Sequence, residues 1–140
     1  MGKIIAFANQ KGGVGKTTSA VNIAADIGHL GFKTLLVDCD PQGNASGAVG
    51  GTSGKGGVWE LLIDGKDAES TIQKTKFKNL DVITSDMNLA AADIELAEKD
   101  KREFALKSSL ESAKNAYDYI ILDCPPSLSL ITLNALTCAD

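Results

Sequence analysis

The sequence is poor in cysteine, has no excess of positive charge and lacks a long apolar segment near its start. Its three cysteines, Cys39, Cys124 and Cys138, show neither C-x-x-C spacing nor a paired histidine, which excludes a recognisable metal or redox motif. Two of them fall at the expected ends of strands, where cysteine is usually a small buried hydrophobe. An odd number of cysteines without a signal sequence is typical of a reducing cytoplasm, which is the predicted location.

Basic residues are outnumbered by acidic ones. The chain has 14 Lys and Arg against 18 Asp and Glu, a formal net charge of −4. This balance argues against a broad basic face for nucleic acid on the chain taken alone. A local basic patch stays open at Lys74, Lys76 and Lys78, although alternating lysines are most often one solvated strand face.

The apolar run at residues 4–8 is too short for a secretory signal or a membrane span. The Gly2 start lacks Ser or Thr at position 6, which excludes a myristoylation signal. No membrane partner is therefore expected. With 140 residues, of which 44% are hydrophobic and 23% charged, the chain is predicted to be globular and of the α/β class.

Short apolar runs alternate with helical segments along the chain. Strands are predicted at residues 4–8, 34–38, 80–84 and 119–123, with a short edge strand near 71–72. Helices are predicted at 16–30, 58–63, 88–115 with a break near 99–100, and from about 127–129 onward. Residues 45–57 are interpreted as a mobile surface loop. The alternation predicts parallel strands joined by right-handed crossovers, with the wholly apolar run at 4–8 buried on both faces.

The segment NQKGGVGKTT nearly fits the phosphate-loop pattern G-x-x-x-x-G-K-[ST]. Gly15, Lys16 and Thr17 are in place, but Gln10 stands where the first glycine is expected, and Lys11 is a second lysine. The glycines allow several N–H groups to point at phosphate oxygens, and the following helix adds its N-terminal dipole. The pattern predicts nucleotide binding, with Lys16 on the β/γ-phosphates and the Thr17 hydroxyl on Mg²⁺. The alternative is a glycine-rich turn with incidental lysines.

Three aspartates come at the ends of expected strands. Asp38 and Asp40 end the second strand, and Asp123 ends the last one. Because the carboxyl ends of parallel strands meet at one edge, all three are predicted beside the phosphate loop. There they are candidates to bind Mg²⁺ or its waters and to orient an attacking water, with Asp123 in the position of a Walker B aspartate. The alternatives are structural: β-turn chemistry for Asp40 and a capped turn for Asp123.

The segments KGGVGKTT, LVDCDPQGN and YIILDCPP occur in this order, and with them the chain resembles the ParA/Soj family of chromosome- and plasmid-partitioning ATPases. The resemblance extends to the wider deviant Walker A ATPases, including MinD and the nitrogenase iron protein, while DPQGN favours ParA/Soj. It implies a P-loop NTPase-type parallel sheet flanked by helices on both faces. It also implies that residues 1–140 are the N-terminal part of a single ATPase domain whose C-terminal half is missing.

The function implied by the resemblance is slow, partner-stimulated ATP hydrolysis with ATP and Mg²⁺ as cofactors. Such proteins form a homodimer on ATP binding, respond to a ParB-type centromere-binding protein, and bind DNA non-specifically. The DNA contacts are expected in the absent C-terminal half, and the intact protein is expected in the cytoplasm on the nucleoid. The implied catalytic residues are Lys11, which reaches the partner's nucleotide, Lys16, and Asp40, which orients the attacking water.

The remaining implied site residues are those of the nucleotide and the metal. The implied metal residues are Thr17, Asp38 and Asp123, and the implied nucleotide-binding residues are Lys11, Gly12, Gly13, Val14, Gly15, Lys16, Thr17 and Thr18.

Other members of the wider group remain as alternatives. A MinD-like, membrane-associated regulator of cell division would be distinguished by a C-terminal amphipathic helix, which lies outside this sequence. An electron-transfer or metal-cluster carrier would need cysteine ligands, and Gln42 stands where the nitrogenase relative has a lysine. A non-catalytic binding module would leave the phosphate loop without a role.

Overall fold

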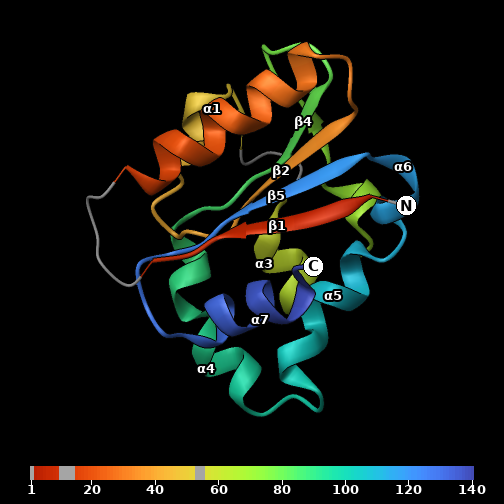
Figure 1. Cartoon of the computed structure of the whole chain (residues 1–140). Coiled ribbons are helices and arrows are strands. Elements are labelled where there is room, and N and C mark those ends of the chain that lie inside the picture. The colour runs from red at the N-terminus through yellow and green to blue at the C-terminus, as the bar shows by residue number, and fades with distance from the viewer. Residues whose placement is uncertain (1, 10–14, 53–55) are drawn as a thin grey trace.

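The apolar runs form one five-stranded sheet in the order β1-β5-β2-β4-β3. We describe residues 2–9, 15–52 and 56–140 of a computed structural model of the chain (Figure 1). Strands β1, β5, β2 and β4 are parallel, as predicted, and β3 is an antiparallel edge strand slightly later than expected. Their bounds are β1 Lys3–Phe7, β2 Thr34–Asp38, β3 Gln73–Lys74, β4 Leu80–Ile83 and β5 Tyr119–Asp123.

Strand β1 lies at an edge of the sheet, so the prediction that it is buried on both faces is wrong. Within Lys3–Phe7 only Ile4 is fully buried, and Ile5 is 37% exposed. Every residue of β2, by contrast, is buried, because β2 lies between β5 and β4. An apolar run therefore identified the strand but not its place in the sheet.

One face of the sheet carries α1 (Lys16–His29) and α2 (Asn44–Ala48). Helix α1 approaches the sheet through small residues spaced four apart, Ala20, Ala24 and Gly28, all of which are buried. A Cβ on Gly28 would lie 2.6 Å from the Lys78 carbonyl oxygen, so only glycine permits this approach. Helix α2 begins one residue before the segment expected to be a mobile loop and extends into it, and its Ala45 is fully buried against this core.

The opposite face is covered by a group of short helices (Figure 1). The region predicted as two helical pieces at 88–115 is divided further, although its break near 99–100 is confirmed. No helix in the described part of the chain is long and apolar enough to cross a lipid bilayer. The helices are α3 Val58–Leu62, α4 Ala92–Ala97, α5 Ala105–Leu110, α6 Ala113–Ala116 and α7 Leu130–Cys138, with 3₁₀ turns η2 Ala68–Ser70, η3 Met87–Ala91 and η4 Arg102–Phe104.

The fold gives the sheet two chemically different edges. At the carboxyl edge, the ends of β2 and β5 meet the first turn of α1, and Asp38 is paired in register with Asp123. At the amino edge, the chain enters β2 and β4 side by side, since the Thr34 N–H donates to the Asn79 carbonyl oxygen at 2.9 Å. The predicted site lies at the first of these edges.

Candidate functional site

The carboxylate of Asp123 binds the two polar side chains that begin α1. The Lys16 ammonium nitrogen lies 2.6 Å from Oδ1 of Asp123, and the Thr17 hydroxyl donates to Oδ2 at 2.8 Å. Asp123 is fully buried and the Lys16 side chain is only 10% exposed. Charge-assisted hydrogen bonds of this kind are short and strong in a water-poor place. The structure therefore brings together three of the predicted site residues in one cluster.

The first turn of α1 is positioned by Gly15, its N-terminal flanking residue. Gly15 has φ +74°, in the left-handed region, and a Cβ there would meet no atom within 4 Å. The glycine is thus required by backbone conformation rather than by space. After it, Lys16 and Thr17 turn toward Asp123, and Thr18 lies exposed. The N–H groups of this turn have no partner within the helix and suit an anion.

Asp38 is held mainly by protein donors. Its Oδ1 accepts the Asp40 N–H at 3.1 Å, and its Oδ2 accepts both the N–H and the hydroxyl of Ser46, at 2.8 and 2.7 Å. Burial raises the pKa of the Asp38 carboxyl above its ordinary value, the Ser46 and Asp40 hydrogen bonds lower it part of the way, and the charge of Asp123 adds to the rise. Asp38 therefore organises the chain around the site besides facing Asp123.

Asp40 lies beside this network and is 8% exposed. Its Oδ1 accepts the Gln42 N–H at 3.0 Å, and its carbonyl oxygen accepts the Gly43 N–H at 3.0 Å, so the predicted turn at this residue is confirmed. Among the described residues no hydrogen bond reaches Oδ2 of Asp40. Within the described residues, this oxygen is therefore left for a water or a ligand.

Two serines that the sequence did not single out connect the strand ends. Ser46 is buried in α2 and, besides binding Asp38, its hydroxyl accepts the Ser85 N–H at 3.1 Å. The Ser85 hydroxyl in turn donates to the Asp40 carbonyl oxygen. Ser46 and Ser85 belong to no motif, and serine is common in loops. Only the tertiary structure shows that they tie the end of β2 to the end of β4.

The oxygen donors of the cluster suit a Mg²⁺–nucleotide better than a metal alone. Thr17 and the carboxylates of Asp38 and Asp123 are ligands of the kind Mg²⁺ prefers, usually completed by waters and substrate phosphates. Within the described residues no group of three or more His, Cys, Asp or Glu side chains is placed to hold a metal ion. The residues thus fit a metal whose coordination a phosphate completes.

The remaining predicted residues, Lys11, Gly12, Gly13 and Val14, lie outside the described residues. The structure brings Lys16, Thr17 and Asp123 into contact, while Asp38 and Asp40 adjoin them through the turn after β2. Cys39 and Cys124 are buried as expected of small hydrophobes, and burial raises the pKa of the Cys124 thiol to about 12. Neither thiol belongs to the reactive chemistry of the site.

A Ser46→Ala substitution is expected to destabilise the protein by about 1.5–3 kcal/mol near neutral pH, because it removes a hydrogen bond to an ionised, buried carboxylate. In the wild type, the folded pKa of Asp38 lies above the ordinary 3.8, so this group's contribution to stability falls as pH rises through the folded pKa. Losing the hydroxyl raises that pKa further. The destabilisation by Ser46→Ala should therefore shrink in acid, where Asp38 is protonated, as measured by urea unfolding across pH.

Ser109→Ala is the matched control. Ser109 is also buried, but its hydroxyl donates to the neutral Leu61 carbonyl oxygen at 3.0 Å. Its loss should cost stability by an amount that does not depend on pH. Equal pH profiles for the two variants would contradict the role given to Ser46.

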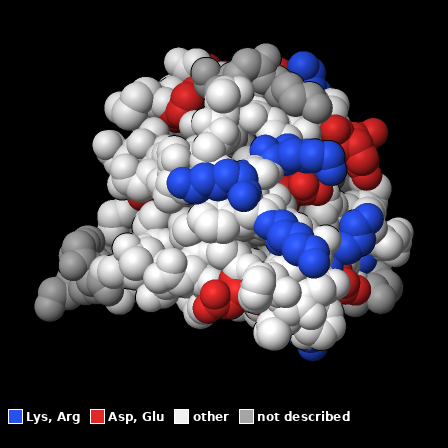
Figure 2. All heavy atoms as spheres, turned by 90° about the horizontal axis from the view of Figure 1, so that it is seen from above, with Lys and Arg blue, Asp and Glu red and all other residues white. Residues whose placement is uncertain are grey.

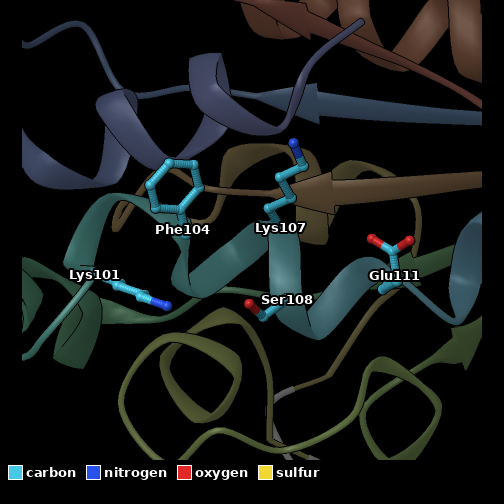
Figure 3. A pocket seen from close by; sticks show the side chains of 5 residues that line it. All are labelled: Lys101, Phe104, Lys107, Ser108 and Glu111. Carbon is cyan, nitrogen blue, oxygen red and sulfur yellow. The ribbon is translucent and has the colours of Figure 1, made fainter.

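A separate hollow lies among the helices on the opposite face of the sheet from α1. Its volume is about 610 Å³. Figure 3 shows the Phe104 and Lys107 side chains directed to one side and Ser108 to another, with the Lys101 and Lys107 head groups pointing in different directions. No converging charged groups mark it as part of the candidate site. Its lining residues are Lys101, Phe104, Lys107, Ser108 and Glu111.

Known proteins share the sequence and the fold of this chain. The sequence profile of the AAA domain family AAA_31 matches residues 2–140. The sporulation initiation inhibitor protein Soj of Bacillus subtilis is 51% identical over the whole chain, which covers 56% of that protein. The chromosome partitioning protein ParA of Myxococcus xanthus is 45% identical over the whole chain, which covers 50% of it. The chain spans about half the length of these relatives.

A solved structure matches the fold closely. The crystal structure of cobyrinic acid a,c-diamide synthase from Mycobacterium smegmatis, with a bound ATP analogue and magnesium, superposes with a TM-score of 0.93 at 37% identity. The match covers 99% of this chain and 57% of that one. The five-stranded sheet and its helices are therefore those of a known nucleotide-binding architecture.

Proposed function

The chain belongs to the AAA_31 family of AAA domains, as a member of the ParA/Soj type, and on this premise we propose that it binds Mg²⁺-ATP and hydrolyses it. The observation that carries the proposal is the cluster of Lys16, Thr17 and Asp123 at the first turn of α1, where a lysine, a hydroxyl and a buried carboxylate converge. Phosphoryl transfer needs charge stabilisation and positioning more than covalent chemistry, and these groups supply both.

Each residue has a distinct part in the proposed reaction. Lys16 holds the β/γ-phosphates as a compact positive charge, while Thr17 and Asp123 hold the metal or its waters. A bound Mg²⁺ supplies neutralisation of the negative charge on the phosphates. Asp40, whose Oδ2 accepts no hydrogen bond from the described residues, orients the attacking water. Asp38 keeps the turn after β2 in place through Ser46.

We further propose that the whole protein acts in chromosome or plasmid partitioning. The relatives named for Soj and for chromosome partitioning are 51% and 45% identical, whereas the synthase structure is 37% identical. The proposal includes an ATP-dependent homodimer, hydrolysis stimulated by a ParB-type partner, and a cytoplasmic, nucleoid-associated protein. Non-specific binding of duplex DNA is assigned to the part of the relatives that this chain does not span.

The second lysine of the loop, Lys11, links the two halves of this proposal. A lysine supplied in trans to the partner's phosphates would make ATP binding and dimerisation one switch, as an arginine finger does. In the whole protein, Lys11→Ala is therefore expected to abolish the ATP-dependent dimer while the monomer still binds ATP. Light scattering with and without Mg²⁺-ATP measures the first property, and calorimetry the second.

Lys66→Ala serves as the control, because Lys66 is exposed and lies outside the loop. It should dimerise as the wild type does. An ATP-dependent dimer that survives Lys11→Ala would show that Lys11 does not act across the interface, while leaving the ATP site itself in place.

A further inference from the structure

The amino edge of the sheet carries positive charge in a chain that is negative overall. The sequence from 74 to 79, KTKFKN, leads into β4, and Lys33 leads into the neighbouring β2. Lys33 and Lys74 line one polar hollow of about 180 Å³, together with Phe77 and Asn79, which flank Lys78. Lys76 lies over the ring of Phe77. We call these four residues, Lys33, Lys74, Lys76 and Lys78, the lysine face.

Figure 2, seen from above, shows several Lys and Arg side chains gathered on one part of the surface, with Asp and Glu side chains among them. Asp81 lines the same hollow and accepts the Tyr117 hydroxyl at 2.6 Å, while Asp118 accepts the Lys33 main-chain N–H at 2.9 Å. Within the described residues the ion pairs involve Lys16 and Lys114, so none of the lysine face forms one. Four lysines against the one carboxylate that lines the hollow leave this face with a positive balance for an anionic partner.

The connection before β4 is a hydrogen-bonded turn that carries Lys76 and Lys78 at the surface. The Thr75 hydroxyl accepts the Phe77 N–H at 3.0 Å and donates to the Leu80 carbonyl oxygen at 2.7 Å. Asn79 takes the left-handed conformation at φ +59°, and its amide donates to the Gly28 carbonyl oxygen at 3.1 Å. Because the turn is fixed at both ends, Lys76, Phe77 and Lys78 are presented without the entropy cost of ordering a free loop.

Partly exposed aromatic rings lie among the lysines. Phe77 is 36% exposed, and the Lys76 ammonium lies 5.5 Å from its ring centroid. Phe32, next to Lys33, is 45% exposed and packs edge-on against Tyr119 at 5.6 Å. Lysines interleaved with exposed rings are the composition of surfaces that bind single-stranded nucleic acid, where phosphates meet the lysines and bases stack on the rings.

Simple protection of the sheet edge explains only part of this arrangement. Lysines on an edge strand discourage pairing with another chain, and Lys74 lies on the edge strand β3. Lys33, Lys76 and Lys78 lie outside the strands and have no such role. An acidic peptide would use the charges but would gain little from the phenylalanine rings.

We propose that the lysine face binds single-stranded nucleic acid, with phosphates on the four lysines and an unstacked base on Phe77. A duplex would offer its phosphates but no free base, so the exposed rings favour the single strand. The surface lies at the amino ends of the strands, opposite the Lys16 cluster. This proposal therefore does not depend on the proposed ATPase activity. Its test accordingly leaves the ATP site untouched.

The test is fluorescence anisotropy of a labelled oligothymidylate with this chain over a range of salt concentrations. Four phosphate contacts to a single strand predict a slope of log K against log salt of about −3. The double variant Lys76→Glu/Lys78→Glu should make the salt dependence shallower, with a slope of about −1.5 or closer to zero. It should also weaken binding strongly at low salt. Phe77→Leu, which keeps an apolar side chain, should weaken binding about tenfold with the slope unchanged, since stacking does not release counterions.

Lys101→Glu/Lys107→Glu is the matched control, with the same change of net charge at residues that line a different hollow. It should bind the oligonucleotide nearly as the wild type does, and thermal melts check that all variants fold. Three results overturn the proposal: equal losses in both double variants, equal affinity for a duplex of the same length, or equally effective competition by polyglutamate with no effect of Phe77→Leu.

Discussion

Replacing Lys16 with alanine is expected to weaken ATP binding at least about a hundredfold, so that calorimetry no longer detects saturable binding. Its ammonium group lies 2.6 Å from Asp123 in a place where the lysine side chain is 10% exposed. Charge-assisted contacts there contribute about 1.5–3 kcal/mol each, and a lysine that reaches two phosphates makes more than one. Retained submicromolar affinity would refute the assignment of the phosphate loop.

The same substitution removes the cation from a fully buried carboxylate, so stability should also fall by about 3–5 kcal/mol. Among the described residues, the Asp123 carboxylate then keeps the hydrogen bond from the Thr17 hydroxyl. The double variant Lys16→Ala/Asp123→Asn removes the uncompensated charge and should recover most of the thermal stability without recovering ATP binding. Asp123→Asn alone keeps Lys16 and should still bind ATP in the presence of a chelator. If binding returned together with stability, Lys16 would act through folding rather than on the nucleotide.

Asp40→Ala is expected to leave Mg²⁺-ATP binding nearly unchanged and to lower turnover by about a hundredfold or more, the usual contribution of a group that directs a proton or a water. Asp40 is 8% exposed and uses Oδ1 to accept the Gln42 N–H. Its other oxygen makes no hydrogen bond within the described part of the chain. Phosphate release under saturating ATP measures the turnover, and calorimetry measures the binding.

Asp40→Asn separates the two roles of this side chain. The amide oxygen still accepts the Gln42 N–H and so preserves the turn, but the group no longer carries a charge. It should lose turnover as Asp40→Ala does. An active Asn variant beside an inactive Ala variant would show that Asp40 only shapes the turn.

The grouping of the aspartates was predictable because it follows from strand polarity alone. Strands that run parallel end at the same edge, and the register indeed pairs Asp38 with Asp123. The convergence of Lys16 and Thr17 on Asp123 follows equally, since the loop between β1 and α1 opens at that edge. Local sequence was sufficient to predict where a site residue lies whenever a single strand or a single motif determines its position.

The order of strands and the supporting hydrogen bonds were not predictable in this way. Residues 4–8 form a strand as expected, but an apolar run does not reveal which neighbours a strand has, and β1 lies at the edge. Helix α2 was missed because its sequence, NASGA, is typical of a loop. It is stabilised by contacts distant in sequence: Ser46 binds Asp38, and Ala45 packs beneath α1. Tertiary contacts override propensity there.

The edge position of β1 also has a consequence on the ribosome. Its neighbour in the sheet is β5, and the ion pair between Lys16 and Asp123 joins residues 107 positions apart. At a synthesis rate of about 5–20 residues per second, roughly 5 to 20 seconds separate the lysine from its aspartate. Throughout that interval the nascent chain holds an apolar strand with no neighbour to pair with, because β5 comes between β1 and the already synthesised β2. The first strand is thus among the last to join the sheet, and until β5 is made it is an unpaired apolar strand of the kind that promotes aggregation.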